Sequence, residues 1–481
     1  MKKRAETPII NALETYSTNG KIKMHMPGHK GGKGFAKWFV ENLVQYDITE
    51  IPGLDNLHNP ESVIKASMER CANVFGARKS FYLVNGSTSG IHAMLISAFN
   101  RGDRLLVQRD CHQSVINALI LSGIQPVFVT PGYNERWHLK MPAGLHDWEK
   151  AVLSNPDIKG AVVTYPDYYG MCAPISEIAD LMHQNGKLLL VDEAHGAHFA
   201  ISRRLPQTAL KQGADLCVQS FHKTLPALTQ AAVLHIGSDR ISEDRVKRAV
   251  SMLTTTSPSY PVMASIEYAA DFAKTDGSGE YDRLICLLDD IKKELNKMVR
   301  LKILPDEIQG IKRDPTRIVI DTSDSCLTGY DLYEKLSREY GIVAEMADES
   351  HVVFIVTTAD SEKELTHLKN SLMDLDRKSD PADSQKKHLS FRPMEQGKCI
   401  IPELSVYLNG CRYIPLNDSE GKRSAGMVTP YPPGIPMLCP GETITREHIH
   451  LLRDISTSRV DVHGISISGN GREIKIRVFD E

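Results

Sequence analysis

The chain has 481 residues, of which 41% are hydrophobic and 24% charged, and its formal net charge is −3. This composition is typical of a globular protein with two or three domains. The small net charge predicts no broad electrostatic surface for nucleic acid or anionic lipid, and no apolar run is long enough to cross a bilayer. The nine cysteines include no Cys-x-x-Cys pair, and the basic N-terminus leads into no apolar segment. We therefore expect a cytoplasmic protein with reduced thiols.

Residues 1–60 are predicted to form an N-terminal arm with loops that contribute to a site. Apolar side chains between Ile9 and Tyr16 have helical spacing and predict an amphipathic helix over 5–20. The following loop carries His25 and His29 on either side of a Pro-Gly turn. With no acid or cysteine nearby, these two histidines do not predict a metal site.

Residues 61–300 are predicted to form a large α/β domain, because short apolar runs alternate there with helical patterns. The expected strands are 81–84, 104–108, 126–130, 160–164, 187–192, 215–219 and 231–236. The expected helices are 64–75, 91–99, 113–121, 145–153 and 175–184, with a long helix over 262–301 that breaks near 274–279. Such alternation is typical of a mainly parallel, seven-stranded sheet covered on both faces.

Two charged residues follow neighbouring strands of this predicted sheet. Lys223 lies in Ser220-Phe221-His222-Lys223-Thr224, and Asp192 ends the strand before it. A desolvated lysine loses its proton easily and becomes a nucleophile that forms a Schiff base with an aldehyde. An enzyme that uses pyridoxal 5′-phosphate (PLP) needs this lysine, and it needs an acid opposite the pyridine nitrogen. The pair therefore predicts a PLP site.

Other candidate residues also follow strand ends, where open α/β sheets bind their ligands. Ser87-Thr88-Ser89 starts a helix, so it is either a phosphate cradle or an ordinary N-cap. His112 is either a neighbour of a helix cap or an aromatic lid on the cofactor, and we favour the lid. The turn at 165–170 is a further candidate.

Residues 301–481 are predicted to form a smaller α+β domain with a charged linker near 376–390. Helical patterns cover 403–408 and 446–455, and 460–479 alternates as two antiparallel strands around Gly469-Asn470-Gly471. The proline-rich run 427–436 is expected to be a rigid loop near the site.

Taken together, these motifs resemble the Orn/Lys/Arg decarboxylase family in its short bacterial form, a family of fold type I PLP enzymes related to aspartate aminotransferase. The matching motifs are Pro27-Gly28-His29, Leu54-Asp55-Asn56-Leu57-His58, Asn85 to Ser89, Cys111-His112, Asp192-Glu193-Ala194-His195, Ser220 to Lys223, Thr229-Gln230-Ala231, Thr256-Ser257-Pro258 and Tyr431-Pro432-Pro433-Gly434. One departure is Gly426, where members often have an acidic residue.

The resemblance implies a role for each matching position. Lys223 would carry PLP, and Asp192 would pair with its pyridinium nitrogen. His112 would stack on the ring, with Ala194 on the opposite face. The phosphate group would be held by Thr88, Ser89, Ser220 and His222. Thr256 would reach the phosphate of a neighbouring subunit, which implies a homodimer with shared sites.

The implied activity is decarboxylation of arginine, lysine or ornithine to an amine that feeds polyamine synthesis. His222 or Lys223 would return a proton to the carbanion. Glu50, Asp55 and Asp167 are candidates for recognising the substrate's cationic side chain. Fold type I also serves aminotransferases and lyases, and an aminotransferase would need an arginine clamp such as Arg412 or Arg423. A PLP-binding regulator without activity is the remaining alternative.

Overall fold

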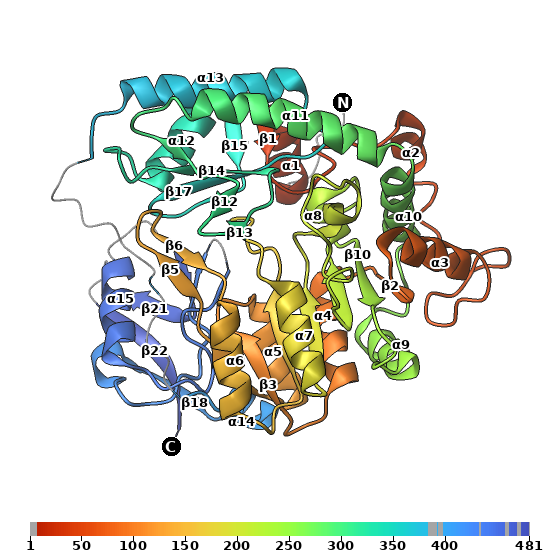
Figure 1. The fold of residues 1–481 in the computed structure, drawn as a ribbon, viewed down its shortest axis with the longest axis vertical. Helices are drawn as coiled ribbons and strands as arrows, with labels where there is room; N and C mark the ends of the chain where they lie inside the picture. The colour runs from red at the N-terminus through yellow and green to blue at the C-terminus, as the bar shows by residue number, and fades with distance from the viewer. Residues whose placement is uncertain are drawn as a thin grey trace.

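We describe the fold from a computed structural model, covering residues 7–382, 392, 398–431, 434–456, 461–468 and 473–480. Three sheets, each with its own helices, make up most of the molecule. In Figure 1 the largest sheet lies in the lower centre, a second sheet lies above it, and the C-terminal sheet lies at the lower left. The described part of the chain contains no helix long and apolar enough to cross a membrane.

The large sheet has seven strands in the order β2-β10-β9-β8-β7-β3-β4. Their bounds are β2 (Lys79–Leu83), β3 (Arg104–Gln108), β4 (Gln125–Val129), β7 (Gly160–Thr164), β8 (Leu188–Asp192), β9 (Leu216–Gln219) and β10 (Ala232–Ile236). Strand β10 runs antiparallel to both of its neighbours, β2 and β9, and the other neighbouring strands of this sheet pair in parallel. The predicted α/β fold with a mainly parallel seven-stranded sheet is confirmed.

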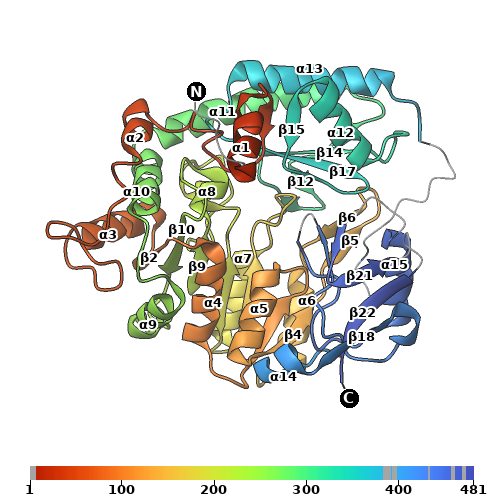
Figure 2. The same cartoon turned by 180° about the vertical axis from the view of Figure 1, so that it is seen from behind.

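Helices cover both faces of this sheet, and alternate strand residues enter two different hydrophobic clusters. Leu105 and Val162 pack with α4 (Gly86–Ala98), α5 (Gln113–Ser122) and α9 (Glu243–Leu253) on one face, which Figure 2 shows in front. Leu106 and Val163 pack with the helices of the other face. These are α3 (Val63–Phe75), α6 (Leu145–Ser154), α7 (Ile175–Gln184), α10 (Tyr260–Lys274) and α11 (Gly277–Leu295).

Helix α4 begins at Gly86, five residues earlier than its apolar pattern indicates. Its first turn, residues 86–89, carries no apolar side chain, and the helix comes close to the sheet at Gly90. A Cβ at Gly90 would stand 2.5 Å from Leu83 Cδ1 and 3.0 Å from Val218 Cγ1, so no larger residue fits there. The predicted break in the long helix is present as the separation of α10 from α11.

The second sheet has the order β11-β14-β17-β16 and begins the region 301–481. Its strands are β11 (Lys302–Ile303), β14 (Arg317–Asp321), β16 (Met346–Ala347) and β17 (His351–Ile355), with helices α12 (Gly329–Glu339) and α13 (Glu362–Lys378). The N-terminal arm joins this unit. Its helix α1 (Pro8–Thr18) precedes β1 (Ile22–Met24), which pairs in parallel with β15 (Ile342–Ala344).

The C-terminal sheet is antiparallel, in the order β18-β22-β21. Its strands are β18 (Cys411–Pro415), β21 (Ile465–Ser468) and β22 (Glu473–Phe479), with helices α14 (Leu404–Asn409) and α15 (Arg446–Ser456) and the pair β19 (Thr429–Tyr431) and β20 (Asp461–His463). The two larger sheets of the region 301–481 are therefore separate from each other. The Gly469-Asn470-Gly471 turn lies outside the described residues, as does most of the predicted linker after α13.

The remaining elements are short. They are α2 (Lys37–Asn42), β5 (Gly132–Asn134), β6 (Leu139–Met141), the 3₁₀ turns η1 (Ala197–Ala200) and η2 (Leu416–Asp418), α8 (Phe221–Thr224), β12 (Glu307–Ile308) and β13 (Ile311–Lys312).

Candidate active site

Lys223 lies on α8, the short helix that follows β9, and Asp192 is the last residue of the adjacent parallel strand β8. Burial is the main cause that lowers the pKa of Lys223 to about 8, and the charge of Arg317 adds to it while Asp192 and Glu345 oppose it. Burial raises the pKa of Asp192, and the charge of Lys223 opposes that shift. Asp192 Oδ1 accepts a hydrogen bond from Ala194 N at 3.2 Å.

The starts of α4 and α8 are attached to consecutive carbonyl groups. Gly86 N donates to Gln230 O at 2.9 Å, and His222 N donates to Ala231 O at 3.3 Å. No side chain caps the N-terminus of α4. Ser220 Oγ is buried and has no hydrogen-bond partner among the described residues. Free backbone N–H groups at a helix start and an unpaired buried hydroxyl together form a site that suits a phosphate group.

Thr88 and Ser89 lie in the first turn of α4, beside this cradle, and Ser89 Oγ donates to Gly86 O at 2.8 Å. Ala194 is buried and lies two residues after Asp192, the last residue of β8. Thr256 is exposed on the loop between α9 and α10, next to Thr255, whose carbonyl accepts a hydrogen bond from His58 Nε2 at 2.8 Å.

His112 is the N-cap of α5, and its Nδ1 accepts a hydrogen bond from Ser114 N at 3.2 Å. His112 is therefore itself the cap of α5, and its favoured role as an aromatic lid on the cofactor stays a prediction. Burial, and then the charge of Lys223, lower the pKa of His112 to about 4. The ring is thus neutral at physiological pH, which keeps it available as a stacking surface.

His222 also has a neutral ring. Its Nδ1 lies 3.0 Å from Ala231 O, a carbonyl that can only accept, so the ring proton is on Nδ1. Burial lowers the pKa of His222 to about 4, and Lys223 contributes to the same shift.

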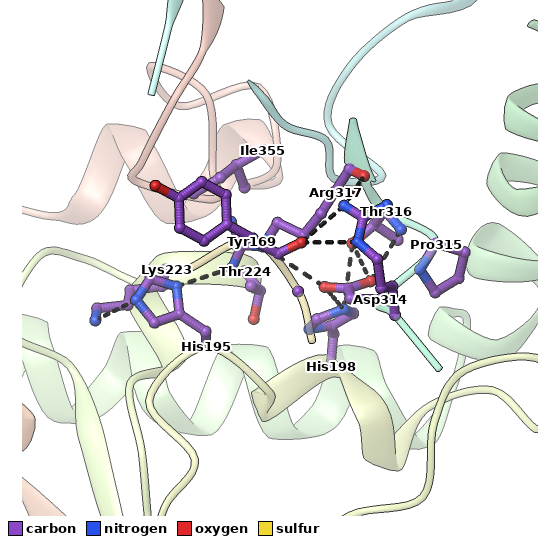
Figure 3. A network of polar contacts seen from close by, with 12 residues as sticks. Tyr169, His195, His198, Lys223, Thr224, Asp314, Pro315, Thr316, Arg317 and Ile355 are labelled. Atoms are coloured by element: carbon purple, nitrogen blue, oxygen red, sulfur yellow. Dashed lines mark hydrogen bonds and ion pairs between the residues drawn. The ribbon is translucent and has the colours of Figure 1, made fainter. Parts of the chain in front are cut away.

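His195 belongs to one of the matching motifs, but the sequence predicted no role for it. The structure places His195 Nε2 3.0 Å from Lys223 Nζ and His195 Nδ1 2.8 Å from Arg317 Nη2, as the dashed lines in Figure 3 show. The ring of Tyr168, from the predicted 165–170 turn, lies 4.5 Å from the His195 ring. Arg317 begins an apolar strand of the second sheet, and nothing in its sequence context indicated a position beside Lys223.

The three acids predicted to recognise a substrate cation have different surroundings. The Asp55 carboxylate accepts hydrogen bonds from the backbone N–H groups of Asn56, Glu61, Ser62, Ile64 and Lys65. Its charge is therefore used to cap the start of α3. Burial raises the pKa of Asp167 to about 7, and Asp167 Oδ1 accepts from Met171 N at 2.8 Å. Glu50 Oε1 is buried without a partner among the described residues.

Both predicted clamp arginines make contacts within the C-terminal unit. Arg412 forms an ion pair with Asp480 at 3.2 Å, and Arg423 lies over the ring of Phe479 at 5.7 Å. Both arginines belong to the C-terminal unit, and the guanidinium that lies beside Lys223 and His195 is that of Arg317.

The loop at 436–442 is attached to the end of β3, near His112. Arg109 donates to the carbonyl oxygens of Pro436 and Met437 at 2.7 and 3.0 Å and to Glu442 Oε2 at 2.8 Å. Pro432 and Pro433 of the proline-rich motif lie outside the described residues. At Gly426, a Cβ would lie 3.1 Å from the carbonyl oxygen of Gly464.

Comparison with protein families gives two matches. The family model "Orn/Lys/Arg decarboxylase, major domain" matches residues 7–312, and the model "Orn/Lys/Arg decarboxylase, C-terminal domain" matches residues 404–478.

Curated relatives match along nearly the full chain. The uncharacterized protein YaaO of Bacillus subtilis is 35% identical over 95% of this chain and 96% of its own. The arginine decarboxylase of Halalkalibacterium halodurans is 32% identical over 96% of both chains, and that of Bacillus subtilis is 31% identical over 92% of both. The lysine decarboxylase LdcA of Pseudomonas aeruginosa is 23% identical over 95% of this chain and 78% of its own.

Solved structures share the fold. The lysine decarboxylase LdcF of Francisella novicida has a TM-score of 0.78 at 21% identity, covering 98% of this chain and 81% of that one. A serine palmitoyltransferase of Sphingomonas wittichii has a TM-score of 0.60 at 16% identity, covering 75% of this chain and 88% of that one. These neighbours share the fold type I architecture of PLP enzymes, which agrees with the predicted fold.

Proposed function

Because the chain belongs to the Orn/Lys/Arg decarboxylase family of PLP-dependent carboxy-lyases, it decarboxylates a basic amino acid, and we propose that this amino acid is arginine. The observation that supports arginine is the higher identity to curated arginine decarboxylases than to a curated lysine decarboxylase. The product would be agmatine, an amine that can feed polyamine synthesis.

We further propose that residues 61–300 bind PLP, with residues 1–60 as an arm over the site and 301–481 completing it. The groups on the chain fit this cofactor, since the unpaired Ser220 hydroxyl and the uncapped start of α4 suit its phosphate. The residues that would hold PLP are Lys223, Asp192, Ala194, His112, Thr88, Ser89, Ser220 and His222. When bound, PLP supplies an electron sink for the electron pair that remains on Cα as CO2 leaves.

Asp192 would hold a proton on the pyridine nitrogen. Its carboxylate is 3% exposed and accepts a backbone N–H from Ala194, which fixes its direction. An anion in such a dry environment interacts with an opposite charge far more strongly than it would in water. Burial alone raises the pKa of Asp192. The positive charge of a protonated pyridine nitrogen would oppose this shift and favour the ionised carboxylate.

Of the two predicted proton donors, we assign the protonation of Cα to Lys223. A pKa of about 8 lets the Lys223 amine exchange protons near neutral pH. His222 has a pKa of about 4, and its one ring proton is donated to Ala231 O. His222 would instead hold the backbone and the phosphate side of the site in position.

We propose a homodimer in the cytoplasm in which Thr256 reaches the phosphate of the partner's cofactor. Thr256 is exposed, which leaves its side chain available to a second chain. The expected apolar face of α1 has no buried residue in the single chain, since Ile9 is 76% and Leu13 62% exposed. Apolar surface of this kind suits an interface between subunits.

The test is an assay of the purified holoenzyme with arginine, lysine and ornithine, in which CO2 and amine are both measured. Equimolar CO2 and agmatine, formed faster from arginine than the corresponding products from the other two, would support the proposal. Preference for lysine or ornithine would reject arginine as the substrate. Keto acid without CO2 would reject decarboxylation in favour of transamination, and no turnover would favour a regulator.

A further inference from the structure

A chain of polar contacts joins Lys223 to the second sheet through His195. Lys223 Nζ lies 3.0 Å from His195 Nε2, and Arg317 Nη2 lies 2.8 Å from His195 Nδ1. His195 and Arg317 are buried, with Arg317 only 1% exposed, and Lys223 is half-buried. Figure 3 shows His195 linked to both partners, one on each side of its ring.

Two contacts position the Arg317 side chain. Its Nε lies 3.7 Å from Asp314 Oδ2, and Asp314 in turn forms an ion pair with His198 Nε2 at 3.1 Å. Gly170 lies beneath the stem of Arg317 with φ +86°, and a Cβ there would stand 3.0 Å from Arg317 Cγ. Arg317 thus has an ion pair at its guanidinium and close packing along its stem, and its Nε and Nη1 have no hydrogen-bond partner among the described residues.

The chemistry of the groups determines where the proton of His195 lies. A guanidinium only donates hydrogen bonds and stays protonated in proteins, so His195 Nδ1 must accept and carries no proton. A neutral imidazole has one proton, which must then be on Nε2, directed at Lys223 Nζ. An ammonium has no lone pair to accept it. This geometry therefore favours the neutral amine of Lys223.

We infer that Arg317 is a positioning residue that holds His195 in the Nε2–H tautomer, so that His195 donates to Lys223 and favours its neutral amine form. A neutral amine is the form in which a lysine attacks an aldehyde. This role of Arg317 rests on the proposed function, in which Lys223 is the lysine that carries the cofactor.

The other charges around the two groups are consistent with this arrangement. Lys223 faces Asp192 and Glu345, which favour its charged form, and burial together with Arg317 outweighs them. Burial is the main cause that holds the pKa of His195 far below its ordinary value. The charge of Lys223, when that amine is protonated, and the permanent charge of Arg317 act in the same direction, with smaller contributions from His112 and His222. Protonation of His195 is therefore not a competing solution at neutral pH.

The first experiment measures the reactivity of Lys223 in cofactor-free protein by competitive acetylation with trace acetic anhydride across pH, read by mass spectrometry. The exposed Lys37 is an internal standard. His195→Gln can place an N–H at the Nε2 position, whereas the shorter His195→Asn can offer its carbonyl oxygen to Arg317 at the Nδ1 position but its amide does not extend to the Nε2 position. Both variants are uncharged and retain the Arg317 charge, so they separate the hydrogen bond from the Coulomb effect.

We expect Lys223 of His195→Gln to react within about threefold of the parent at pH 7.5, and that of His195→Asn to react about tenfold more slowly, a shift of about one pKa unit. Parent-like reactivity in His195→Asn would overturn the inference. So would a loss in His195→Gln as large as that in His195→Asn.

The second experiment reads the tautomer directly from 15N shifts of labelled histidine in cofactor-free protein, with His195 assigned by its disappearance in His195→Gln. We expect a protonated Nε2 and an unprotonated Nδ1 in the parent, a tautomer mixture in Arg317→Met, and partial restoration in Arg317→Lys. A proton on Nδ1 of the parent would refute the inference even if a variant failed to fold. Neither readout needs cofactor or substrate, so failure of the proposed reaction would be distinguishable.

Discussion

The backbone N–H of Gly28 donates a hydrogen bond to the carbonyl oxygen of His222 at 2.7 Å. A Cβ at position 28 would lie 2.7 Å from the carbonyl oxygen of Leu225, a distance that Cβ atoms do not adopt. The N-terminal arm therefore lies directly on the helix that carries Lys223. Thr357 Oγ1 donates to Gly28 O at 2.8 Å, so the second sheet is tied to the same point.

Gly28→Ala should push the arm away from α8 and weaken cofactor binding by at least about tenfold, with a loss of about 1–3 kcal/mol in the free energy of unfolding. PLP titration and urea unfolding measure these effects. The control is Gly279→Ala in α11, where a Cβ has open space and should be neutral or stabilising by up to about 1 kcal/mol. Equal behaviour of the two variants would mean that the close contact at Gly28 has no consequence.

Asp192→Asn should reduce kcat by about 10²–10³-fold, because an amide cannot balance a positive charge on the pyridine nitrogen. The amide oxygen can still accept from Ala194 N, so the backbone turn after β8 should persist. Steady-state decarboxylation by holoenzyme, with cofactor content measured in parallel, tests this. A variant with full cofactor content and more than a third of the parental kcat would contradict the role of Asp192.

The ion pair between Arg109 and Glu442 is buried, with side chains 11% and 1% exposed. Glu442→Ala leaves a buried guanidinium without its anion, which should reduce the free energy of unfolding by about 3–5 kcal/mol. Glu420→Ala breaks the exposed pair with Arg446 and should cost less than about 1 kcal/mol. Urea unfolding of both variants measures the difference, and comparable losses would show that the attachment of the 436–442 loop adds no stability.

His351 should make stability depend on pH. Its Nδ1 lies 3.0 Å from Asp348 Oδ1 and its Nε2 lies 2.8 Å from Trp137 O, so the ring is held as an imidazolium. Burial opposes the charge, but Asp348 outweighs it and raises the pKa of His351. The stabilisation is fully present below the unfolded-state pKa of about 6.5 and is lost as pH rises through the raised value.

The measurement is the free energy of unfolding of the parent and of His351→Gln between pH 5.5 and pH 9. We expect the parent's advantage to be largest at the acidic end and to decline toward the alkaline end. The partner Asp348 has a lowered pKa, so its own contribution is lost only in strong acid, outside this range. A difference that is constant, or that grows with pH, would contradict an ionised pair.

Local patterns predicted the large sheet well because its strands are buried on both faces and their signal is continuous. All seven strands lie within a residue or two of their apolar runs. The start of α4 was missed by five residues, since its first turn consists of glycine and small hydroxyl residues and carries no apolar stripe. The two separate sheets of 301–481 depend on long-range pairing, such as β14 with β17, which leaves no local signal.

The position of Lys223 and Asp192 at the ends of neighbouring parallel strands was predictable, because each residue follows its own apolar run. Arg317 was not, because an arginine at the start of an apolar strand is usually solvated, and only the approach of the second sheet to α8 places it beside His195. Asp55 was predicted as a candidate for recognising the substrate's cation because it is an acid in an irregular loop. Its carboxylate accepts hydrogen bonds from backbone amides, and its pKa is lowered to about 2.

The central claim is that Lys223 binds the cofactor covalently. The most direct measurement is borohydride reduction of the holoenzyme followed by peptide mass spectrometry. We predict one phosphopyridoxyl group per chain, on Lys223, and none in Lys223→Ala. A label on a different lysine, or no label on a protein that is fully active with added PLP, would contradict the account.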